Sequence, residues 1–309
     1  MRCAASASFV YAGRVATLHR ERAAADAALD ELLEGTIFAG HVYRFASIDS
    51  TNSALLADAG LPAGSGLNDA SGPGLPEGTV YLADEQTAGR GRAGHTWHSP
   101  PGVGLYLSAL LRPSLPPDEL LGITLAAGIA AAQAIFQVAG AQCDVRWPND
   151  LLLHNKKTGG ILTEMNSGNG GAVVVGFGIN VNQTSQPPEL QESATSLLLA
   201  KNAQVPAKDD KRAHTQGFPA DAARVDATAL AAALLQFFDR EYRSLVQHGL
   251  PALLARFEQH SSYVRGKRVV VGEEGGYEGI SAGLDDRGFL RVHTAEGMRT
   301  VLSGSVRAV

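Results

Sequence analysis

The sequence has little cysteine and no long apolar run. Its 309 residues include two cysteines, Cys3 and Cys143, which lie far apart along the chain. This low number of cysteines excludes a disulfide framework and a zinc site made of cysteine, and it is typical of a reducing compartment. No apolar run reaches the length of a membrane span, and the first residues, MRCAASASFVYAG, lack the apolar core of a signal peptide. The sequence therefore predicts a cytoplasmic protein that does not enter a membrane.

Positive charge is not in surplus either. Lysine and arginine total 26 against 31 aspartates and glutamates, which gives a formal net charge of −5. A general nucleic-acid binder needs the opposite balance, so we expect no specific DNA partner. The length suffices for about two domains, with a full-sized core in at least one of them.

A glycine-rich stretch, AGRGRAGHTWHSP at residues 88–100, contains the pattern G-x-G-x-x-G of dinucleotide-binding turns. Such a turn requires a strand before the glycines and a helix after them, so that a pyrophosphate lies at the helix N-terminus. Residues 79–84 are typical of a strand, but prolines within 99–102 break the chain, and 104–111 is another apolar run of strand length. We therefore reject a nicotinamide-dependent enzyme and predict a loop between two strands.

This loop places Arg90 and Arg92 between glycines. Glycine lets the backbone approach a ligand closely, successive N–H groups can form an anion-binding nest, and guanidinium groups suit phosphate or carboxylate. A flexible, solvated hairpin loop is the alternative interpretation. Trp97 argues against it, because an aromatic anchor is typical of a lid or a pocket wall.

Helix and strand patterns alternate over most of the chain. Helices are predicted at 20–34, around 54–57 behind a cap at Asp49 or Ser50, and at 118–139, 226–247 and 250–260. Strands are predicted at 41–46, 79–84, 104–111, 142–147, 156–164 (beginning as a turn) and 172–182. The segments 60–78 and 183–225 are rich in turn-forming or polar residues and are predicted to be flexible insertions.

From residue 266 the pattern changes to short strands alone. Runs at 267–271, 277–280, 288–292 and 298–302 are separated by glycine-containing turns. They predict a small all-β domain of the size of an SH3-like barrel.

Four polar stretches interrupt the strands of the central region, at residues 50–52, 86–97, 146–150 and 157–160. They offer hydroxyls and amides, a basic loop, a carboxylate, and a lysine beside glycines. A fixed lysine and arginines stabilise the charge that grows on the oxygens of a reacting phosphate. Asp150 offers the type of oxygen ligand that Mg²⁺ prefers. The set therefore suits reaction at an α-phosphate.

Each stretch alone also has a simpler interpretation. Ser50 and Thr51 suit a helix cap, Trp147 suits core packing before a turn, and the pair Lys156–Lys157 suits a solvated surface. Three histidines near these stretches, His95, His98 and His154, lack the spacing of metal ligands.

Taken in this order, the stretches resemble the biotin–protein ligases, which activate biotin as an adenylate and attach it to a carrier lysine. The matching segments are SIDSTN at 47–52, DEQTAGRGRAGHTWHSP at 84–100, VRWPNDLLL at 145–153, KKTGGILTE at 156–164 and VGFGINVN at 175–182. The resemblance covers about 41–262 and extends into the C-terminal strands. It implies an α+β fold with a mixed sheet flanked by helices, followed by a small SH3-like β-barrel. Three parts are predicted: a helical extension at 1–40, a catalytic domain at 41–262 and the barrel at 266–309.

The resemblance also implies roles for individual residues. The biotin pocket would be formed by Ser50, Thr51, Asn52, Gln86, Arg90, Gly91, Arg92 and Lys157. The ATP and adenylate site would include Arg92, Trp97, Asn149, Asp150 and Asn180. Lys157, Arg90 and Arg92 would be catalytic, and Asp150 would hold Mg²⁺ or order the loop. The implied substrates are biotin and ATP with Mg²⁺, and the implied partner is the biotin carboxyl carrier protein of acetyl-CoA carboxylase or a related carboxylase.

Some features depart from the family pattern or leave rivals to consider. The family motif often has arginine at His95 and lysine at Arg146; the second change keeps the charge, whereas histidine is partly neutral at pH 7. About forty residues precede the first catalytic strand, too few for the winged helix of repressor-type relatives, so we expect a monofunctional ligase, monomeric or homodimeric. A transcriptional regulator is disfavoured for the same reason. A lipoate–protein ligase would need a longer apolar pocket, and its glycine-rich motif is missing near 86–97.

Overall fold

The protein is described by a computed structural model. It describes residues 24–59, 75–116, 119–165, 171–203, 224–272, 275–302 and 304–309. The chain divides into two compact units: unit 1 comprises 1–117 with 161–178, and unit 2 comprises 118–160 with 179–309. The division falls within two strands, β7 (Lys156–Met165) and β8 (Val173–Asn180), so each of these strands contributes to both units.

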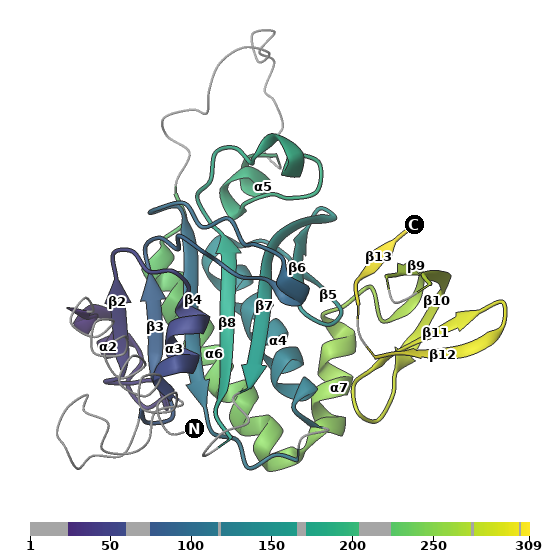
Figure 1. Ribbon diagram of the computed structural model, residues 1–309, viewed down its shortest axis with the longest axis horizontal. Helices are drawn as coiled ribbons and strands as arrows, with labels where there is room; N and C mark the ends of the chain where they lie inside the picture. The colour runs from purple at the N-terminus through teal and green to yellow at the C-terminus, as the bar shows by residue number, and fades with distance from the viewer. Residues whose placement is uncertain are drawn as a thin grey trace, which may run out of the picture. The chain divides into compact units, whose positions relative to one another are not determined.

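Unit 1 holds the first part of a mixed sheet. Its strands are β1 (Ala24–Ala25), β2 (Val42–Phe45), β3 (Val80–Ala83) and β4 (Gly104–Leu111). They are followed by residues 173–178 of β8 and 161–165 of β7. β2 and β3 run parallel, whereas β3 and β4 run antiparallel. Figure 1 shows β3, β4, β8 and β7 side by side in this sheet. In unit 2, residues 156–160 of β7 pair with β6, and β6 pairs with β5.

Helix α3 (Thr51–Ala59) covers one face of the unit 1 sheet. Its side chains Ala54 and Leu55 are buried in one core cluster with Tyr81, Leu110 and Val174 from three strands. Fully burying a side chain such as leucine stabilises the fold by about 1.5–3 kcal/mol. This packing fixes the first turn of α3, which carries the predicted residues Thr51 and Asn52.

Unit 2 is built on three helices: α4 (Leu121–Ala139), α6 (Ala227–His248) and α7 (Leu250–Gln259). They pack against one another, and α4 also packs on β5 (Asp144–Arg146) and β6 (Asp150–Leu153). Local sequence sets their ends, since Asp226 caps α6 by accepting from the amides of Thr228 and Ala229. Gly140, at φ +67°, ends α4.

Helix α4 corrects one expectation. By length and composition it is apolar enough to cross a membrane, although the sequence was expected to hold no run of that length. The most apolar window of α4 is 72% buried inside the protein. Its small residues permit this close packing: a Cβ on Gly128 would lie 3.1 Å from Val145. A helix that is hydrophobic all round therefore serves here as the core helix of unit 2.

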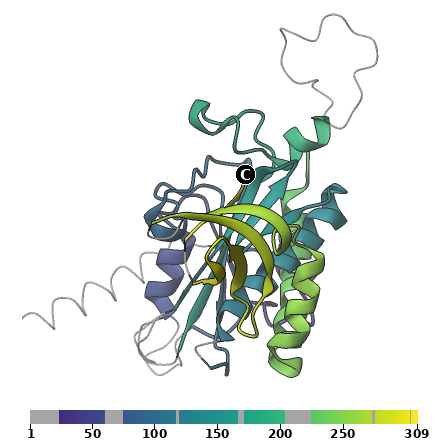
Figure 2. The same cartoon turned by 90° about the vertical axis from the view of Figure 1, so that its right-hand side faces the viewer.

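The C-terminal part of unit 2 is a five-stranded antiparallel sheet with the order β12-β11-β10-β9-β13. Its strands are β9 (Arg265–Val271), β10 (Tyr277–Leu284), β11 (Leu290–Thr294), β12 (Gly297–Val301) and β13 (Val306–Ala308). Figure 2 shows the sheet strongly curved. The predicted fold class, with its mixed sheet, flanking helices and SH3-like end, is confirmed.

The elements differ from the sequence prediction in four places, one of which is β6 (Asp150–Leu153), where no strand was predicted. Where a helix was predicted over 20–34, residues 24–25 pair with β2, and α2 (Ala27–Leu32) begins only at its cap Asp26. The second predicted insertion contains η3 (Pro188–Leu190) and α5 (Leu197–Ala203), whose Leu197 is fully buried. Strand β13 was not anticipated, because its three residues carry no pattern of their own. Residues 60–74 and 204–223 of the two insertions lie outside the described residues, and the three-part domain division stays a prediction.

Candidate functional site

The glycine-rich stretch is a loop between β3 and β4, as predicted. Its two arms pair with each other at Gln86–Ser99 and at Arg90–Thr96, and the amide of Trp97 donates to the carbonyl of Gly89. Gly89 is required by packing, since an added Cβ would lie 2.7 Å from Ser99 Oγ. The indole of Trp97 lies on β8, where a Cβ on Gly178 would be 2.6 Å from Trp97 Nε1. Trp97 therefore anchors one arm of the loop to the sheet.

Behind the loop lies a buried network of hydroxyl and amide groups, which we call the Thr51 network. Ser108 Oγ, on β4, is 2.7 Å from both Thr51 Oγ1 and Asn52 Oδ1. Gln86 Oε1 accepts from the amide of Thr51 at 2.9 Å and lies 3.1 Å from its hydroxyl. Thr51, Asn52 and Ser108 are each at most 3% exposed. The structure thus brings three of the predicted biotin-pocket residues into one network inside unit 1.

The Thr51 network has fewer protons than contacts. Both carboxamide oxygens, on Gln86 and Asn52, can only accept, and two hydroxyl protons serve three oxygen–oxygen contacts. The amide of Thr51 fixes the orientation of Gln86, while Asn52 Nδ2 donates to the carbonyl of Leu162 at 3.2 Å. Neither amide group can turn over to supply the missing proton. The network is therefore rich in acceptors and suits a ligand that brings an N–H donor.

Ser50 and the two loop arginines have different surroundings. Ser50 Oγ accepts from the amide of Ser53, which is the helix-cap interpretation of this residue. Arg90 Nη2 forms an ion pair with Glu164 at 2.6 Å, and Arg90 Nη1 donates to Ser53 Oγ at 2.9 Å. Arg92 begins the short 3-10 turn η1 (Arg92–Gly94) at the loop tip, where Ala93 has φ 53°. Arg90 is thus held in the paired arm just before the turn, and Arg92 lies in the turn at the loop tip.

In unit 2 the predicted charged residues form a second set, the Asp150 cluster. Asp150 contacts Lys157 Nζ through Oδ1 and Arg146 Nη2 through Oδ2, both at 2.5 Å. Burial alone would raise the pKa of Asp150, but the charges and hydrogen bonds of Lys157 and Arg146 outweigh it and hold the pKa below its usual value. The Arg146 guanidinium also lies 6.0 Å from the ring centre of Tyr263. Asp150 is therefore an ionised carboxylate between two cations.

Lys157 and its neighbour make separate contacts, as expected for successive residues of a strand. Lys157 reaches Asp150, whereas Lys156 Nζ donates to the carbonyl of Gln191 at 2.9 Å. A Cβ on Gly160 would lie 3.4 Å from Lys157 Nζ, so the missing side chain leaves the backbone open beside this ammonium.

The two predicted adenylate-site asparagines are both buried. Asn180 Nδ2 donates to the carbonyl of Thr195 at 3.0 Å, and its Oδ1 accepts from Gln183 at 3.2 Å. Asn149 directly precedes Asp150, and the backbone N–H of Asn149 donates to the carbonyl of Arg146 at 3.1 Å. Asn180 therefore ties the end of β8 to the segment that leads into α5.

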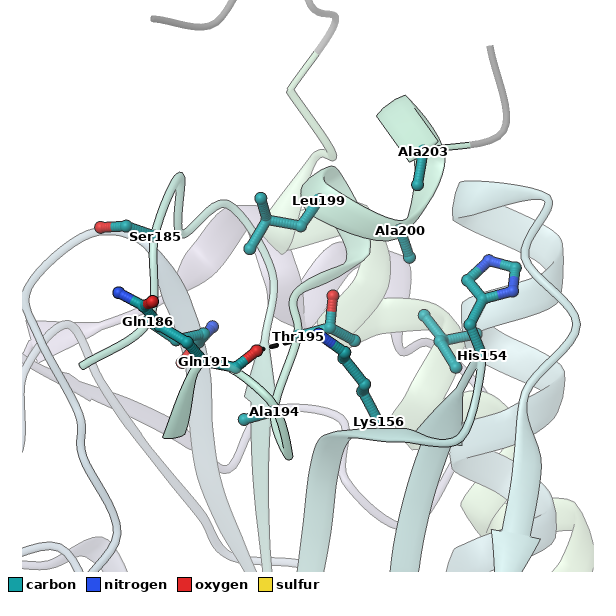
Figure 3. Close-up of a pocket in the computed structure, with 11 residues that line it drawn as sticks. His154, Lys156, Ser185, Gln186, Gln191, Ala194, Thr195, Leu199, Ala200 and Ala203 are labelled. Carbon is teal, nitrogen blue, oxygen red and sulfur yellow. Dashed lines mark hydrogen bonds between the residues drawn. The ribbon is translucent and has the colours of Figure 1, made fainter. Parts of the chain in front are cut away.

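A pocket of about 380 Å³ lies in unit 2 beside Lys156 rather than Lys157. Figure 3 shows Lys156, His154 and Gln191 at its border, with Leu199 and Ala200 of α5 among the apolar residues. None of the residues predicted for biotin or ATP lines it.

Two regions of this chain match known protein families. Residues 66–182 match the Biotin/lipoate A/B protein ligase family, and 265–307 match the Biotin protein ligase C terminal domain. A biotin--[acetyl-CoA-carboxylase] ligase of Mycobacterium tuberculosis is 34% identical over 83% of this chain and 84% of its own. The chain belongs to the biotin protein ligase family.

Other members of the family include proteins of different length. The bifunctional ligase/repressor BirA of Bacillus spizizenii is 35% identical over 75% of this chain, and the matched region spans 66% of that protein. A solved structure of biotin protein ligase from Aquifex aeolicus, in complex with biotin and ATP, has a TM-score of 0.68 and 27% identity. The match covers 87% of this chain and 100% of that one.

Sequence reasoning on this biotin protein ligase family member missed four polar residues of unit 1. Ser108 was available as a signal, because it is the one serine in the apolar strand GLYLSALL. Glu164 ends the motif KKTGGILTE but received no role there. Ser53 and Ser99 carry no such signal, since serine is common near helix caps and loops.

Proposed function

We propose that this protein is an ATP-dependent biotin–protein ligase. In the first step, a biotin carboxylate oxygen attacks the α-phosphorus of ATP, which forms biotinyl-5′-AMP and releases pyrophosphate. In the second, the amine of a carrier lysine attacks the acyl carbon of this mixed anhydride, and AMP leaves with the bonding electron pair. A proton is lost from the amine as the amide forms.

The Thr51 network is the observation that carries the choice of substrate. The ureido ring of biotin brings N–H donors, and the network is one proton short of its contacts. The dithiolane ring of lipoate has no N–H group, so it could not donate to these acceptors, and a buried hydrogen bond that is not made costs about 1–3 kcal/mol. A site built from hydrogen-bonding groups rejects a ligand that lacks them. This supports biotin over lipoate.

The charged residues support the adenylation step. Lys157 would meet the biotin carboxylate and the α-phosphate oxygens, with Arg92 at the loop tip adding a second positive charge to the ligand. Trp97, Asn149, Asp150 and Asn180 would complete the adenylate site. The loop between β3 and β4 would exclude water, which hydrolyses an acyl adenylate.

A covalent enzyme intermediate is not needed for this route. Burial raises the pKa of Cys143 to about 12, so its thiol stays protonated at neutral pH and is a poor nucleophile. The charges of the site therefore act on bound substrates, and the group transferred stays on AMP until the carrier amine attacks.

Magnesium would arrive with ATP rather than occupy a metal centre of its own. Among the described residues, no group of three or more histidine, cysteine, aspartate or glutamate side chains could hold a metal ion. Both oxygens of Asp150 already contact cations. Protein-bound Mg²⁺ commonly uses one or two carboxylates together with substrate phosphates. The prediction that Asp150 holds Mg²⁺ thus requires it to exchange Lys157 or Arg146 for the ion.

The partner would be a biotin carboxyl carrier protein of acetyl-CoA carboxylase or a related carboxylase, met in the cytoplasm. The deciding experiment measures the mass of a purified carrier domain after incubation with this protein, ATP, Mg²⁺ and either biotin or lipoate. We expect the mass of one biotinyl group on one lysine, and no addition with lipoate. Addition of lipoyl alone, or of neither group, would refute the proposal.

A further inference from the structure

Glu164, at the end of β7, joins the glycine-rich loop to helix α3. Its Oε1 pairs with Arg90 Nη2 at 2.6 Å, and its Oε2 accepts from Asn52 Nδ2 at 2.9 Å. The other end of the Arg90 guanidinium donates to Ser53 Oγ at 2.9 Å, which is also on α3. One carboxylate therefore holds the arm of the loop that carries Arg90 against the helix that carries Thr51 and Asn52.

The Thr51 network also reaches the other arm of the loop, which carries Trp97 and Ser99. Gln86 Nε2 donates to Ser99 Oγ at 2.9 Å, and Ser99 Oγ lies 3.3 Å from the carbonyl of Trp97. From there the contacts pass through Thr51 and Ser108 to Asn52, which returns to Glu164. The chain of contacts thus begins at one arm of the loop and ends at the other, and it includes the residues proposed to bind biotin.

The Arg90 guanidinium is poorly suited to act on the reacting phosphate. Its two terminal nitrogens each have a partner within unit 1, and the Glu164 carboxylate at 2.6 Å compensates its charge. A compensated cation adds little to the stabilisation of negative charge that develops elsewhere. Its geometry instead suits a tie between three segments, because guanidinium donors have a rigid fork arrangement.

We propose that Glu164 is a positioning residue of the ligase site and acts through Arg90. This rests on the ligase function proposed above. The carboxylate fixes the arm of the loop that carries Arg90 and the amide of Asn52 together, so that the loop closes over a bound biotin without first having to be ordered. Arg90 is then a loop anchor, and the cation offered by this loop to the ligand is Arg92.

A double-mutant cycle on Glu164→Gln and Arg90→Ala tests this role. Biotin-dependent exchange of pyrophosphate into ATP gives KM for biotin and kcat for each variant. We expect each single variant to raise KM for biotin about tenfold while kcat stays within about threefold, since ordering of the loop is lost but not the chemistry. The double variant should be no worse than about twofold beyond either single one, because both remove the same tie.

Two results would overturn the proposal. If Arg90 acts directly on the adenylate, Arg90→Ala lowers kcat, and its effect multiplies with that of Glu164→Gln. If Glu164 has no positioning role, Glu164→Gln leaves KM for biotin unchanged. A matched control is Glu258→Gln, which breaks the exposed ion pair with Arg265 at 3.1 Å and should leave both constants unchanged.

Hydrogen exchange without any ligand tests the tie independently of the ligase activity. The amide of Trp97 donates to Gly89, and the amide of Gly91 donates to His95 at 2.7 Å. In Glu164→Gln, but not in Glu258→Gln, exchange at these amides should be several-fold faster than in the unchanged protein. Equal exchange in all three would refute the tie. Absence of biotin-dependent pyrophosphate exchange in the unchanged protein would refute the proposed ligase function instead, and the amide exchange would still decide the role of Glu164.

Discussion

The Thr51 network in unit 1 and the Asp150 cluster in unit 2 bury polar groups by opposite means. The network consists of neutral hydroxyls and amides; Thr51, Asn52 and Ser108 are each at most 3% exposed, and Gln86 is partly buried. The cluster consists of full charges that keep some contact with water, since the Lys157 side chain is 34% exposed. Neutral groups can be buried when they are hydrogen-bonded, whereas burial of a charge is far more costly. The Thr51 network therefore suits an uncharged ring, and the Asp150 cluster suits a phosphate.

This comparison predicts that charge in unit 2 governs rate, whereas hydrogen bonding in unit 1 governs affinity. The largest expected effect is at Lys157. Lys157→Ala should reduce the rate of biotin-dependent pyrophosphate release about a hundredfold or more, because a charge-assisted contact to the developing phosphate charge is lost. Lys156→Ala is the matched control and should stay near the unchanged protein, since Lys156 contacts the carbonyl of Gln191 instead. The reverse ranking would contradict the role of Lys157.

The next effect is expected in the Thr51 network. Ser108→Ala leaves Asn52 Oδ1 without the hydroxyl that donates to it, and an unpaired buried acceptor costs about 1–3 kcal/mol. Calorimetry should therefore show biotin binding weakened about tenfold or more, with a lower free energy of unfolding. Ser114→Ala removes an exposed hydroxyl near the end of β4 and should change neither. If kcat for adenylate formation falls while biotin affinity is kept, the division between affinity and rate is wrong.

Asp150→Asn tests the Asp150 cluster through pH. The lowered folded-state pKa means that the ionised form stabilises the fold above the unfolded value of about 3.8, and that this stability is lost as pH falls through the folded-state pKa. At pH 7 the variant should lose about 1–2 kcal/mol of unfolding free energy, less than for a fully buried pair because Lys157 is partly solvated.

The difference between Asp150→Asn and the unchanged protein should then shrink as pH falls below about 3.8, and it should be lost below the folded-state pKa, where the carboxyl of the folded protein also becomes neutral. Denaturant unfolding at several pH values measures it. A difference that persists unchanged at pH 2 would show that the loss comes from packing and not from the charge of Asp150.

The smallest expected effect concerns the loop between the two arms that the network ties. The segment 89–97 contains glycines and charges with little apolar burial, so a bound adenylate should supply interactions that it lacks. Hydrogen exchange in this segment should slow when biotin and ATP are added, mainly in the turn at Arg92, because the arm before the turn is already tied through Arg90. Equal exchange with and without ligand would contradict a closing loop.

The contacts of the C-terminal sheet bear on whether a chain cut at residue 265 still binds biotin. Trp147 Nε1 donates to the carbonyl of Gly288 at 2.9 Å, across the boundary between the central and C-terminal parts. A Cβ on Gly288 would also lie 3.1 Å from Leu125 of α4. Removing the sheet therefore exposes part of the core of unit 2. Biotin binding by such a chain reports on the pocket only when circular dichroism shows that the chain is folded.

The sequence by itself determined the order of the elements and the residue types of the site. Periodicity located α4, α6 and α7 and the strand at 104–111, because these elements bury a face whose repeat is visible in the sequence. The motifs likewise predicted site roles for Thr51, Asn52, Gln86 and Lys157, and these roles stay predictions. Short elements escaped, since β13 and the early turn into α2 depend on a pairing partner and on the cap at Asp26.

Only the tertiary structure decided which of these residues share a hydrogen-bond network. Ser108 and Glu164 lie 56 and 112 positions from Asn52 along the chain, yet both contact its side chain. The pairing of Arg90 with Glu164 likewise depends on segments that are far apart in sequence. Local pattern reports the face and the residue type, whereas the donor that meets each acceptor follows from how the strands pack.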